Sequence, residues 1–156
     1  MSNIDVKTNN MDNIETNKLF YQYLKAAENG DAEAQANLGN FYRNGWGVEK
    51  DEVKAFEWYE KSAKQDYNGA QNRLGVFYEN GTGVERNIEK ALYWYQKAAE
   101  SENKIAQYNL GCCYQNGIGV EKDEIKAFEW YEKSAKQDYN GAQNMLGNFY
   151  KNGNRN

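Results

Sequence analysis

The sequence repeats itself with a period of 36 residues, and this period constrains the fold more than any other feature. A Leu-Gly pair recurs at Leu38, Leu74, Leu110 and Leu146, so successive copies lie 36 positions apart. Tandem units of about this length are typical of solenoids, in which a unit is too small to bury its own apolar side chains and packs against its neighbours. The chain is therefore predicted to be a stack of units with a continuous core.

Each period is predicted to hold two helices, helix A and helix B, separated by a glycine-rich turn. In the first helix A, Ala34, Leu38 and Tyr42 are spaced by four residues, which places them on one side of an α-helix. The Asn44-Gly45 pair that follows tolerates the left-handed conformation found at helix C-termini. Favourable N-cap residues precede the B helices at Asp51, Asn87 and Asp123.

A glycine stands in the middle of every predicted helix A, although glycine in a helix interior costs about 1 kcal/mol relative to alanine. The four are Gly39, Gly75, Gly111 and Gly147. Their repetition indicates a packing role, because a position without a side chain leaves a recess for a Trp, Tyr or Leu side chain of a neighbouring helix.

Two repeats depart from the others where helix A begins. Tyr67 and Tyr139 stand at the position that Asp31 and Asn103 occupy in the other copies. Tyrosine is a poor N-cap residue. We therefore expect the asparagines that follow, Asn68 and Asn140, to cap these two helices.

The repeated pattern resembles the Sel1-like repeat, a relative of the tetratricopeptide repeat. The motif A-x-x-x-L-G-x-x-Y-x-x-G-x-G-V-x-x-D-x-x-K-A-x-x-W-Y-x-K-A-A is matched in the first copy by Ala34, Leu38, Gly39, Tyr42, Gly45, Gly47, Val48, Asp51, Lys54, Ala55, Trp58, Tyr59, Lys61 and Ala63, with Ser62 in an Ala position. The resemblance extends from about Asn17 to Gly153. It implies a right-handed superhelix with the A helices along its inner surface. It also implies an adaptor role, because members of the family act in endoplasmic-reticulum degradation complexes, chitin synthase regulation and bacterial host interaction, and extend some fungal kinases.

We therefore predict an all-α fold, an α/α solenoid of about eight helices in the order B, three A-B pairs and a last A. The solenoid is expected to span 13–153. Its parts are a leading half-repeat (13–30), three repeats (31–66, 67–102 and 103–138) and a trailing half-repeat (139–153). Residues 1–12 are expected to form a disordered tail, and 154–156 a short C-terminal tail.

Charge and hydropathy argue against two classes of partner. The net charge is −4, and Lys and Arg are interleaved with Asp and Glu, so the basic stripe that nucleic acid requires is missing. No apolar run approaches the roughly 18 residues of a membrane span, and the first residues lack the pattern of a signal peptide. We expect a cytoplasmic protein that acts alone or as part of a larger protein or complex.

The sequence indicates neither a catalytic site nor a metal or cofactor site. It contains no His, which removes Ser-His and Cys-His nucleophile pairs and His-ligated metals. The Gly-x-Gly turns are not followed by the Lys-Ser/Thr of a phosphate-binding loop. Cys112 and Cys113 are expected to be one outward-facing and one half-buried thiol. A cysteine-rich branch of the Sel1-like family, linked to penicillin binding, has a disulfide in each repeat, and this chain lacks those paired cysteines.

These inferences predict a non-catalytic scaffold or adaptor that binds a protein or peptide partner on the concave face of the A helices. The alternative is a small-ligand-binding, carbohydrate-binding or hydrolase-like role in the groove of the superhelix. No cofactor is expected in the first case.

Comparison of the chain with itself indicates where specificity resides. Residues 48–72 and 120–144 are identical except for Val53 against Ile125. Beyond this block the copies diverge along one side of helix A, whereas the outer side of helix B is unchanged. Drift and recent exchange between copies are alternative explanations. We interpret the divergent side as the partner-binding face, formed by Asn37, Asn40, Arg73, Val76, Tyr108, Asn109, Cys112, Met145 and Asn148.

Overall fold

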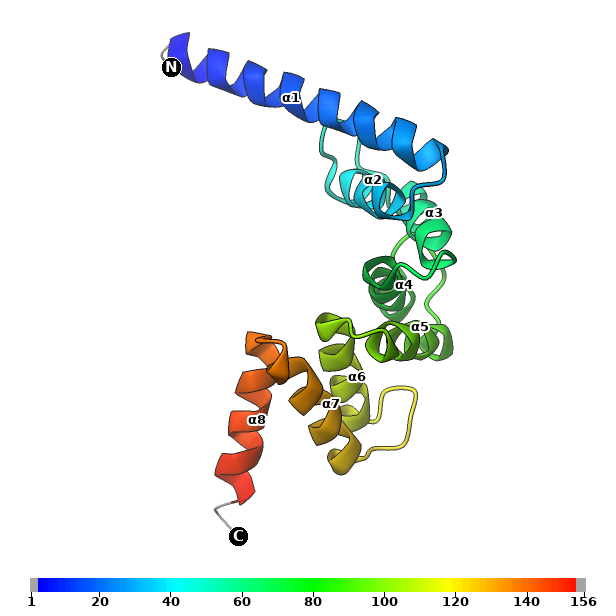
Figure 1. The fold of residues 1–156 in the computed structure, drawn as a ribbon, viewed down its shortest axis with the longest axis vertical. Helices are drawn as coiled ribbons and strands as arrows, with labels where there is room; N and C mark the ends of the chain where they lie inside the picture. Colours follow the sequence, from blue (N-terminus) through cyan, green and yellow to red (C-terminus); the bar gives the residue numbers. More distant parts are fainter. Residues whose placement is uncertain (1–2, 154–156) are drawn as a thin grey trace.

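The computed structural model describes residues 3–153, and within that span the protein is a stack of eight helices. They are α1 (Asn3–Glu28), α2 (Ala32–Asn44), α3 (Glu52–Ala63), α4 (Asn68–Asn80), α5 (Ile88–Glu100), α6 (Lys104–Asn116), α7 (Glu124–Lys136) and α8 (Asn140–Gly153). Each helix packs against the next one in sequence. The stack bends into an arch, with α2 and α4 on its inner side and α3 and α5 on its outer side (Figure 1). The predicted all-α solenoid, its number of helices and their order are confirmed.

Helix α1 begins earlier than the sequence analysis expects. The helix starts at Asn3, so residues 3–12, expected to be a disordered tail, continue it. The segment before residue 13 contains neither glycine nor proline, the two residues that most disfavour a helix interior, so nothing local ends the helix there. The predicted tail over 154–156 lies outside the described residues.

Local capping explains most of the helix boundaries. The side chains of Asp51, Asn87 and Asp123 each accept the backbone N–H three residues ahead, at 2.9 to 3.0 Å. Gly45 ends α2 in the left-handed conformation, with φ of 69°. The prediction for α4 is wrong. Its N-cap is Tyr67, which makes no capping bond with its side chain, and the Asn68 amide donates instead to the carbonyl of Ser101.

The distance between helix A and helix B is set by a tyrosine ring that lies against a glycine. A Cβ atom built on Gly39 would lie 2.6 Å from Cε1 of Tyr59, and one built on Gly111 would lie 2.7 Å from Cε1 of Tyr131. Gly75 meets Tyr95 in the same way. The three rings are at most 1% exposed. The recess predicted at these glycines is thus confirmed, and its occupant is the tyrosine of the following helix B.

The tryptophan beside each of these tyrosines lies at the edge of the core. Trp58, Trp94 and Trp130 are half-buried. The ammonium of Lys61 lies 4.2 Å from the centre of the Trp58 ring, and Lys133 lies 4.5 Å from that of Trp130. These tryptophans therefore pack on the outer side of the stack and are covered by lysines of their own helix.

Gly147 is the exception among the helix-A glycines. A Cβ atom built there would meet nothing within 4 Å. Helix α8 is the last helix of the described span, so no helix B follows it there with a tyrosine. The packing role expected at Gly147 is therefore not seen.

A glutamine joins each repeat to the one before it, a feature that was not predicted; Gln35, Gln71 and Gln107 are buried, and Gln143 is exposed. The side chains of Gln35, Gln71, Gln107 and Gln143 each donate to the carbonyl of an alanine eight residues earlier, near the end of the preceding helix, at 3.1 to 3.4 Å. Each of these carbonyls also accepts the backbone N–H three residues ahead, so the glutamine adds a second hydrogen bond and ties helix A to the helix before it.

One of these glutamines is incompletely satisfied. Gln65 and Gln137 donate to the side-chain oxygens of Gln35 and Gln107, at 2.8 and 2.9 Å. The corresponding position in the middle repeat is Ser101, which is too short to reach. Accordingly, the Oε1 atom of Gln71 is buried without a hydrogen-bond partner among the described residues.

The same glycine-to-alanine change should have opposite effects at two positions. Gly111→Ala should destabilise the protein by about 1–3 kcal/mol, because the added methyl group collides with the buried Tyr131 ring. Gly147→Ala should stabilise it by up to about 1 kcal/mol, because alanine is the better helix former and the space is open. Urea unfolding followed by circular dichroism measures both. Changes of the same sign at the two positions would contradict the packing role of Gly111.

Ser101→Gln should stabilise the protein by roughly 0.5–1.5 kcal/mol, because it supplies the missing donor to Gln71. Ser101 has φ of −89° and ψ of 26°, close to the −94° and 21° of Gln137, so the glutamine needs no change of backbone. The melting temperature should rise for Ser101→Gln and fall for the matched change Gln137→Ser. A lower melting temperature for Ser101→Gln would contradict this explanation of the unsatisfied oxygen.

Candidate functional site

The nine residues predicted to bind a partner all lie on the A helices α2, α4, α6 and α8. Three of them, Asn37, Asn40 and Arg73, line one hollow of about 160 Å³, which we call the Arg73 hollow. They come from α2 and α4, which lie on the inner side of the arch (Figure 1). The structure therefore joins predicted residues from two successive repeats at one place.

Seven further residues, which were not predicted to bind a partner, complete the Arg73 hollow. They are Ala36, Tyr59, Tyr67, Gly69, Asn72, Asn103 and Ile105. Tyr67 could have been found from the sequence, because it replaces a good N-cap residue. It occupies the N-cap of α4, makes no capping bond with its side chain, and lines the hollow. A position that breaks a local rule in this way is a signal of function.

Arg73 is a half-buried cation without a counter-charge. Within the described part of the protein its guanidinium takes part in no ion pair and no hydrogen bond. Burial lowers the pKa of Arg73, and the positive charge of Arg43 lowers it further. The positive charge of a second arginine thus acts on Arg73 at this place and disfavours the charged form of Arg73 unless an anion is present.

Two of the asparagines at the hollow are partly engaged within the protein. The Tyr59 hydroxyl donates to Oδ1 of Asn40 at 2.7 Å, and Nδ2 of Asn109 donates to Oδ1 of Asn72 at 3.0 Å. An asparagine amide has two donors and an acceptor with two lone pairs. These bonds therefore orient the amides of Asn40 and Asn72 and leave their Nδ2 donors available.

Three other predicted residues lie away from the Arg73 hollow. Val76 is half-buried and packs against the main core cluster. Met145 packs among residues of the last three helices, α6, α7 and α8. Asn148 is on α8, in the last half-repeat. None of the three lines the Arg73 hollow.

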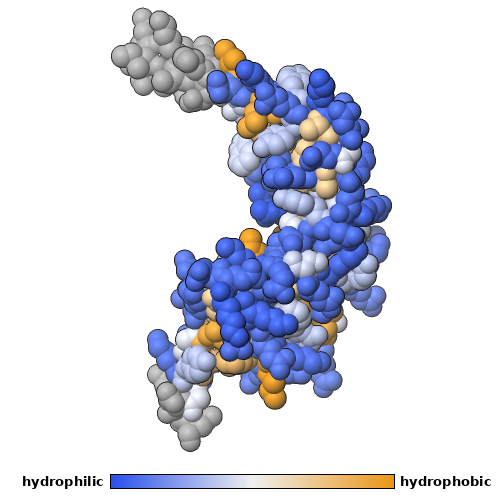
Figure 2. Space-filling model, viewed as in Figure 1, coloured by the Kyte–Doolittle hydropathy of each residue, from blue (hydrophilic) through white to orange (hydrophobic). Residues whose placement is uncertain are grey.

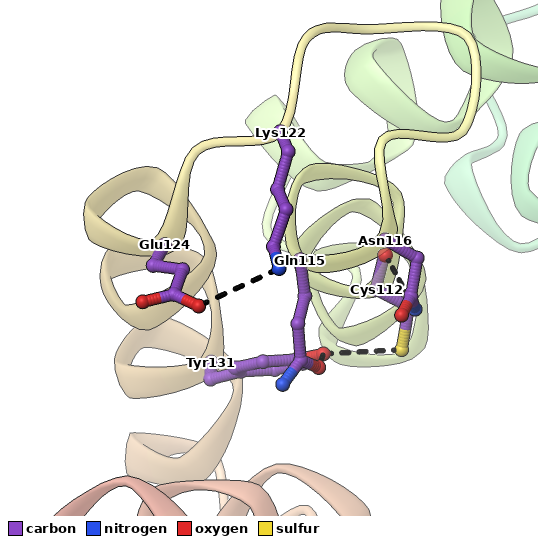
Figure 3. A network of polar contacts seen from close by, with 6 residues as sticks. All are labelled: Cys112, Gln115, Asn116, Lys122, Glu124 and Tyr131. Atoms are coloured by element: carbon purple, nitrogen blue, oxygen red, sulfur yellow. Dashed lines mark hydrogen bonds and ion pairs between the residues drawn. The ribbon is translucent and has the colours of Figure 1, made fainter.

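Cys112 takes part in a polar cluster between α6 and α7 (Figure 3). The Tyr131 hydroxyl contacts both Sγ of Cys112, at 3.3 Å, and Oε1 of Gln115, at 2.7 Å. The Tyr108 ring lies beside this cluster, with its centre 5.7 Å from that of Tyr131. Cys112 and Tyr108 therefore help to fix helix B, which gives them a structural part independent of any partner.

The two cysteines are both free thiols. Cys112 is partly exposed, and Cys113 is buried more deeply than expected, at 3% exposure. Burial raises the pKa of Cys113 to about 12, with smaller contributions from Glu79 and Cys112. A thiol with such a high pKa is protonated at neutral pH and is a weak nucleophile.

A second, apolar hollow adjoins the first. It measures about 430 Å³ and is lined by Thr16, Leu19, Tyr23, Asn37, Asn40, Phe41 and Trp46. Asn37 and Asn40 belong to both hollows, so the two are neighbours along α2. Trp46 is 51% exposed, and the corresponding residues of the later repeats are Thr82 and Ile118. We call this the Trp46 hollow. It was not predicted, and the feature of the sequence that could have indicated it is a tryptophan outside the repeated Trp-Tyr pair.

The face of the protein seen in Figure 2 is mostly hydrophilic, with small scattered hydrophobic patches. Among the residues that the structure describes, no group of three or more His, Cys, Asp and Glu side chains is placed to hold a metal ion. The helices of that same span are all too short or too polar to cross a lipid bilayer.

Comparison with solved structures shows similar stacks of repeats. A Sel1 repeat protein from Oxalobacter formigenes is 39% identical, with a TM-score of 0.77 over 84% of this chain and 54% of that one. A protective antigen of uropathogenic Escherichia coli with an SLR fold is 36% identical, with a TM-score of 0.82 over 86% of this chain and 29% of that one. The cysteine-rich protein B of Helicobacter pylori is 26% identical, with a TM-score of 0.67 over 85% and 96% of the two proteins. The present sequence therefore spans about half of the first protein and less than a third of the second.

No curated protein matches the sequence. A family profile, however, assigns the sequence directly to a family. The family profile of the Sel1 repeat matches residues 32–67, 69–103, 104–139 and 141–155, which together cover most of the sequence. These matches and the similar solved structures show that the chain belongs to the Sel1 repeat family.

Proposed function

We propose that this protein is a non-catalytic scaffold that binds a protein or peptide partner on the concave side of its A helices. Proteins of the Sel1 repeat family generally serve as protein-interaction scaffolds. The observation that carries the proposal is a pair of adjoining hollows that share Asn37 and Asn40 of α2; α1 helps to line one of them and α4 the other. An extended surface of this kind suits a peptide segment that places successive side chains in successive hollows.

The two hollows offer different chemistry to such a segment. The Arg73 hollow is lined by amides, tyrosines and a cation, whereas Leu19, Phe41 and Trp46 make the other hollow largely apolar. At about 160 Å³ the Arg73 hollow is smaller than the roughly 300–1,000 Å³ of sites that enclose whole small molecules. Its size supports the binding of a single side chain or terminal group that belongs to a larger partner.

The outer side of the B helices provides a contrast. Lys61 and Lys133 lie over the tryptophans of their own helices, so their charges already have partners within the protein. The sequence of this side is also the same in the first and third repeats. A surface that is internally paired and repeated has less to distinguish one partner from another.

Partner binding should be lost when both hollows are altered. Arg73→Glu combined with Trp46→Ala removes the cation of one hollow and the apolar wall of the other. Truncating a central anchor typically costs about 2 kcal/mol or more, which is roughly a 30-fold loss of affinity. Affinity capture from a cell lysate, quantified by mass spectrometry against the unaltered protein, measures the loss for each captured protein.

The matched control carries the same kinds of change on the outer side. Lys61→Glu reverses a charge there, and Ile125→Ala removes an apolar side chain that is 75% exposed. This double variant should capture the same proteins as the unaltered protein. Both double variants are first required to keep their helix content and melting temperature. Capture that survives the concave changes and is lost with the outer ones would move the binding site to the convex surface.

A further inference from the structure

We infer that the Arg73 hollow binds a carboxylate group of the partner, from an Asp or Glu side chain or from a C-terminus. The inference rests on the proposed function and names the chemistry that its concave site recognises. The Arg73 guanidinium, half-buried between α2 and α4, carries the argument. It has no acidic partner among the described residues, and a guanidinium matches the geometry of a carboxylate.

The nearby acidic side chains do not neutralise this charge. Burial raises the pKa of the Tyr67 hydroxyl, and the carboxylates of Glu33 and Asp31, which lie near it, raise it further. Oδ1 of Asp31 accepts the backbone N–H of Ala34 at 2.7 Å, because Asp31 is the N-cap of α2. Neither carboxylate forms an ion pair with Arg73 among the described residues. The charge that acts on Arg73 from nearby is instead the positive charge of Arg43.

The neutral groups of the hollow also favour an acceptor. Oδ1 of Asn40 accepts from Tyr59, and Oδ1 of Asn72 accepts from Asn109. Each of these amide oxygens thus has one of its two lone pairs used inside the protein, and both hydrogens at each Nδ2 are left for a ligand. A hollow that presents N–H donors beside a guanidinium selects a group that accepts hydrogen bonds and carries negative charge.

The charge occurs once among the equivalent positions of the concave side. The positions that correspond to Arg73 in the other repeats are Asn37, Asn109 and Met145. Among these four equivalent positions only Arg73 offers a cation to the carboxylate, which would fix the register of the bound segment. The adjoining Trp46 hollow would then receive an apolar side chain of the same segment.

Affinity selection from soluble peptide pools tests this inference. One pool holds random decapeptides with an amidated C-terminus, and the other holds the same decapeptides with a free carboxylate. Each pool is passed over immobilised protein, and the retained peptides are sequenced by mass spectrometry. We expect retained peptides from the amidated pool to be enriched in Asp or Glu if the source is a side chain. Retention confined to the free-acid pool identifies a peptide C-terminus as the source.

Single-residue variants link the selection to Arg73. Arg73→Gln should remove the preference for a carboxylate and raise the Kd of the best retained peptide about ten-fold or more. Lys61→Gln removes a charge from the outer side and should leave that Kd within about two-fold. Both variants are checked for an unchanged melting temperature.

The outcomes separate this inference from the proposed function. If Trp46→Ala abolishes retention while Arg73→Gln changes neither the peptides nor their Kd, the carboxylate assignment is wrong and the concave scaffold stands. If both variants retain peptides as the unaltered protein does, the assignment and the concave site are both wrong. Failure of the unaltered protein to retain any peptide, or retention without enrichment in either pool, also overturns the carboxylate assignment.

Discussion

The contact between a helix-A glycine and a helix-B tyrosine determines how this protein is built. At Gly39, Gly75 and Gly111 the ring of the following tyrosine lies directly on the helix backbone, which leaves no space for even a methyl group. The tyrosine hydroxyl then reaches past the glycine to a polar side chain of helix A: Asn40, Glu79 or Gln115. One side chain therefore sets both the spacing and the rotation of the helix pair. The buried glutamines then make the same hydrogen bond between each helix A and the helix before it, so successive pairs stack in the same way.

This construction leaves the concave side of the A helices free to vary. Because the core positions are fixed by glycine, alanine, leucine and tyrosine, residues such as Asn37 and Arg73 can change without altering the stack. The Arg73 hollow is lined by residues of three successive repeats, so its walls come from helices that the core holds in place. Preorganised walls reduce the entropy that a partner must lose on binding. The charge at Arg73, which the equivalent positions of the other repeats lack, can then distinguish one concave surface from that of another repeat protein.

The period, the caps and the mid-helix glycines made the fold predictable from the sequence, because each has a local physical cause. The length of α1 was misjudged, since residues 3–12 contain no glycine or proline that would end a helix. The candidate site was only partly predictable. Divergence between copies pointed to Asn40 and Arg73, and Asn37 lies on the same side of helix A. Divergence also selected Val76, which packs against the core, and Cys112, which accepts a hydrogen bond from Tyr131. The place of Tyr67 in the hollow and the missing partner of Arg73 depend on neighbours in space, which spacing in the sequence does not reveal.

A double-mutant cycle between Gly111 and Tyr131 tests the central contact most directly. The free energy of unfolding is measured for the unaltered protein, Gly111→Ala, Tyr131→Leu and the double variant. If the tyrosine ring is what excludes the methyl group, Gly111→Ala destabilises the unaltered protein. In the Tyr131→Leu background the same change should be neutral or stabilising. The smaller leucine leaves room for the methyl group at position 111, and alanine favours the helix more than glycine does. An equal cost of Gly111→Ala in both backgrounds would contradict the account.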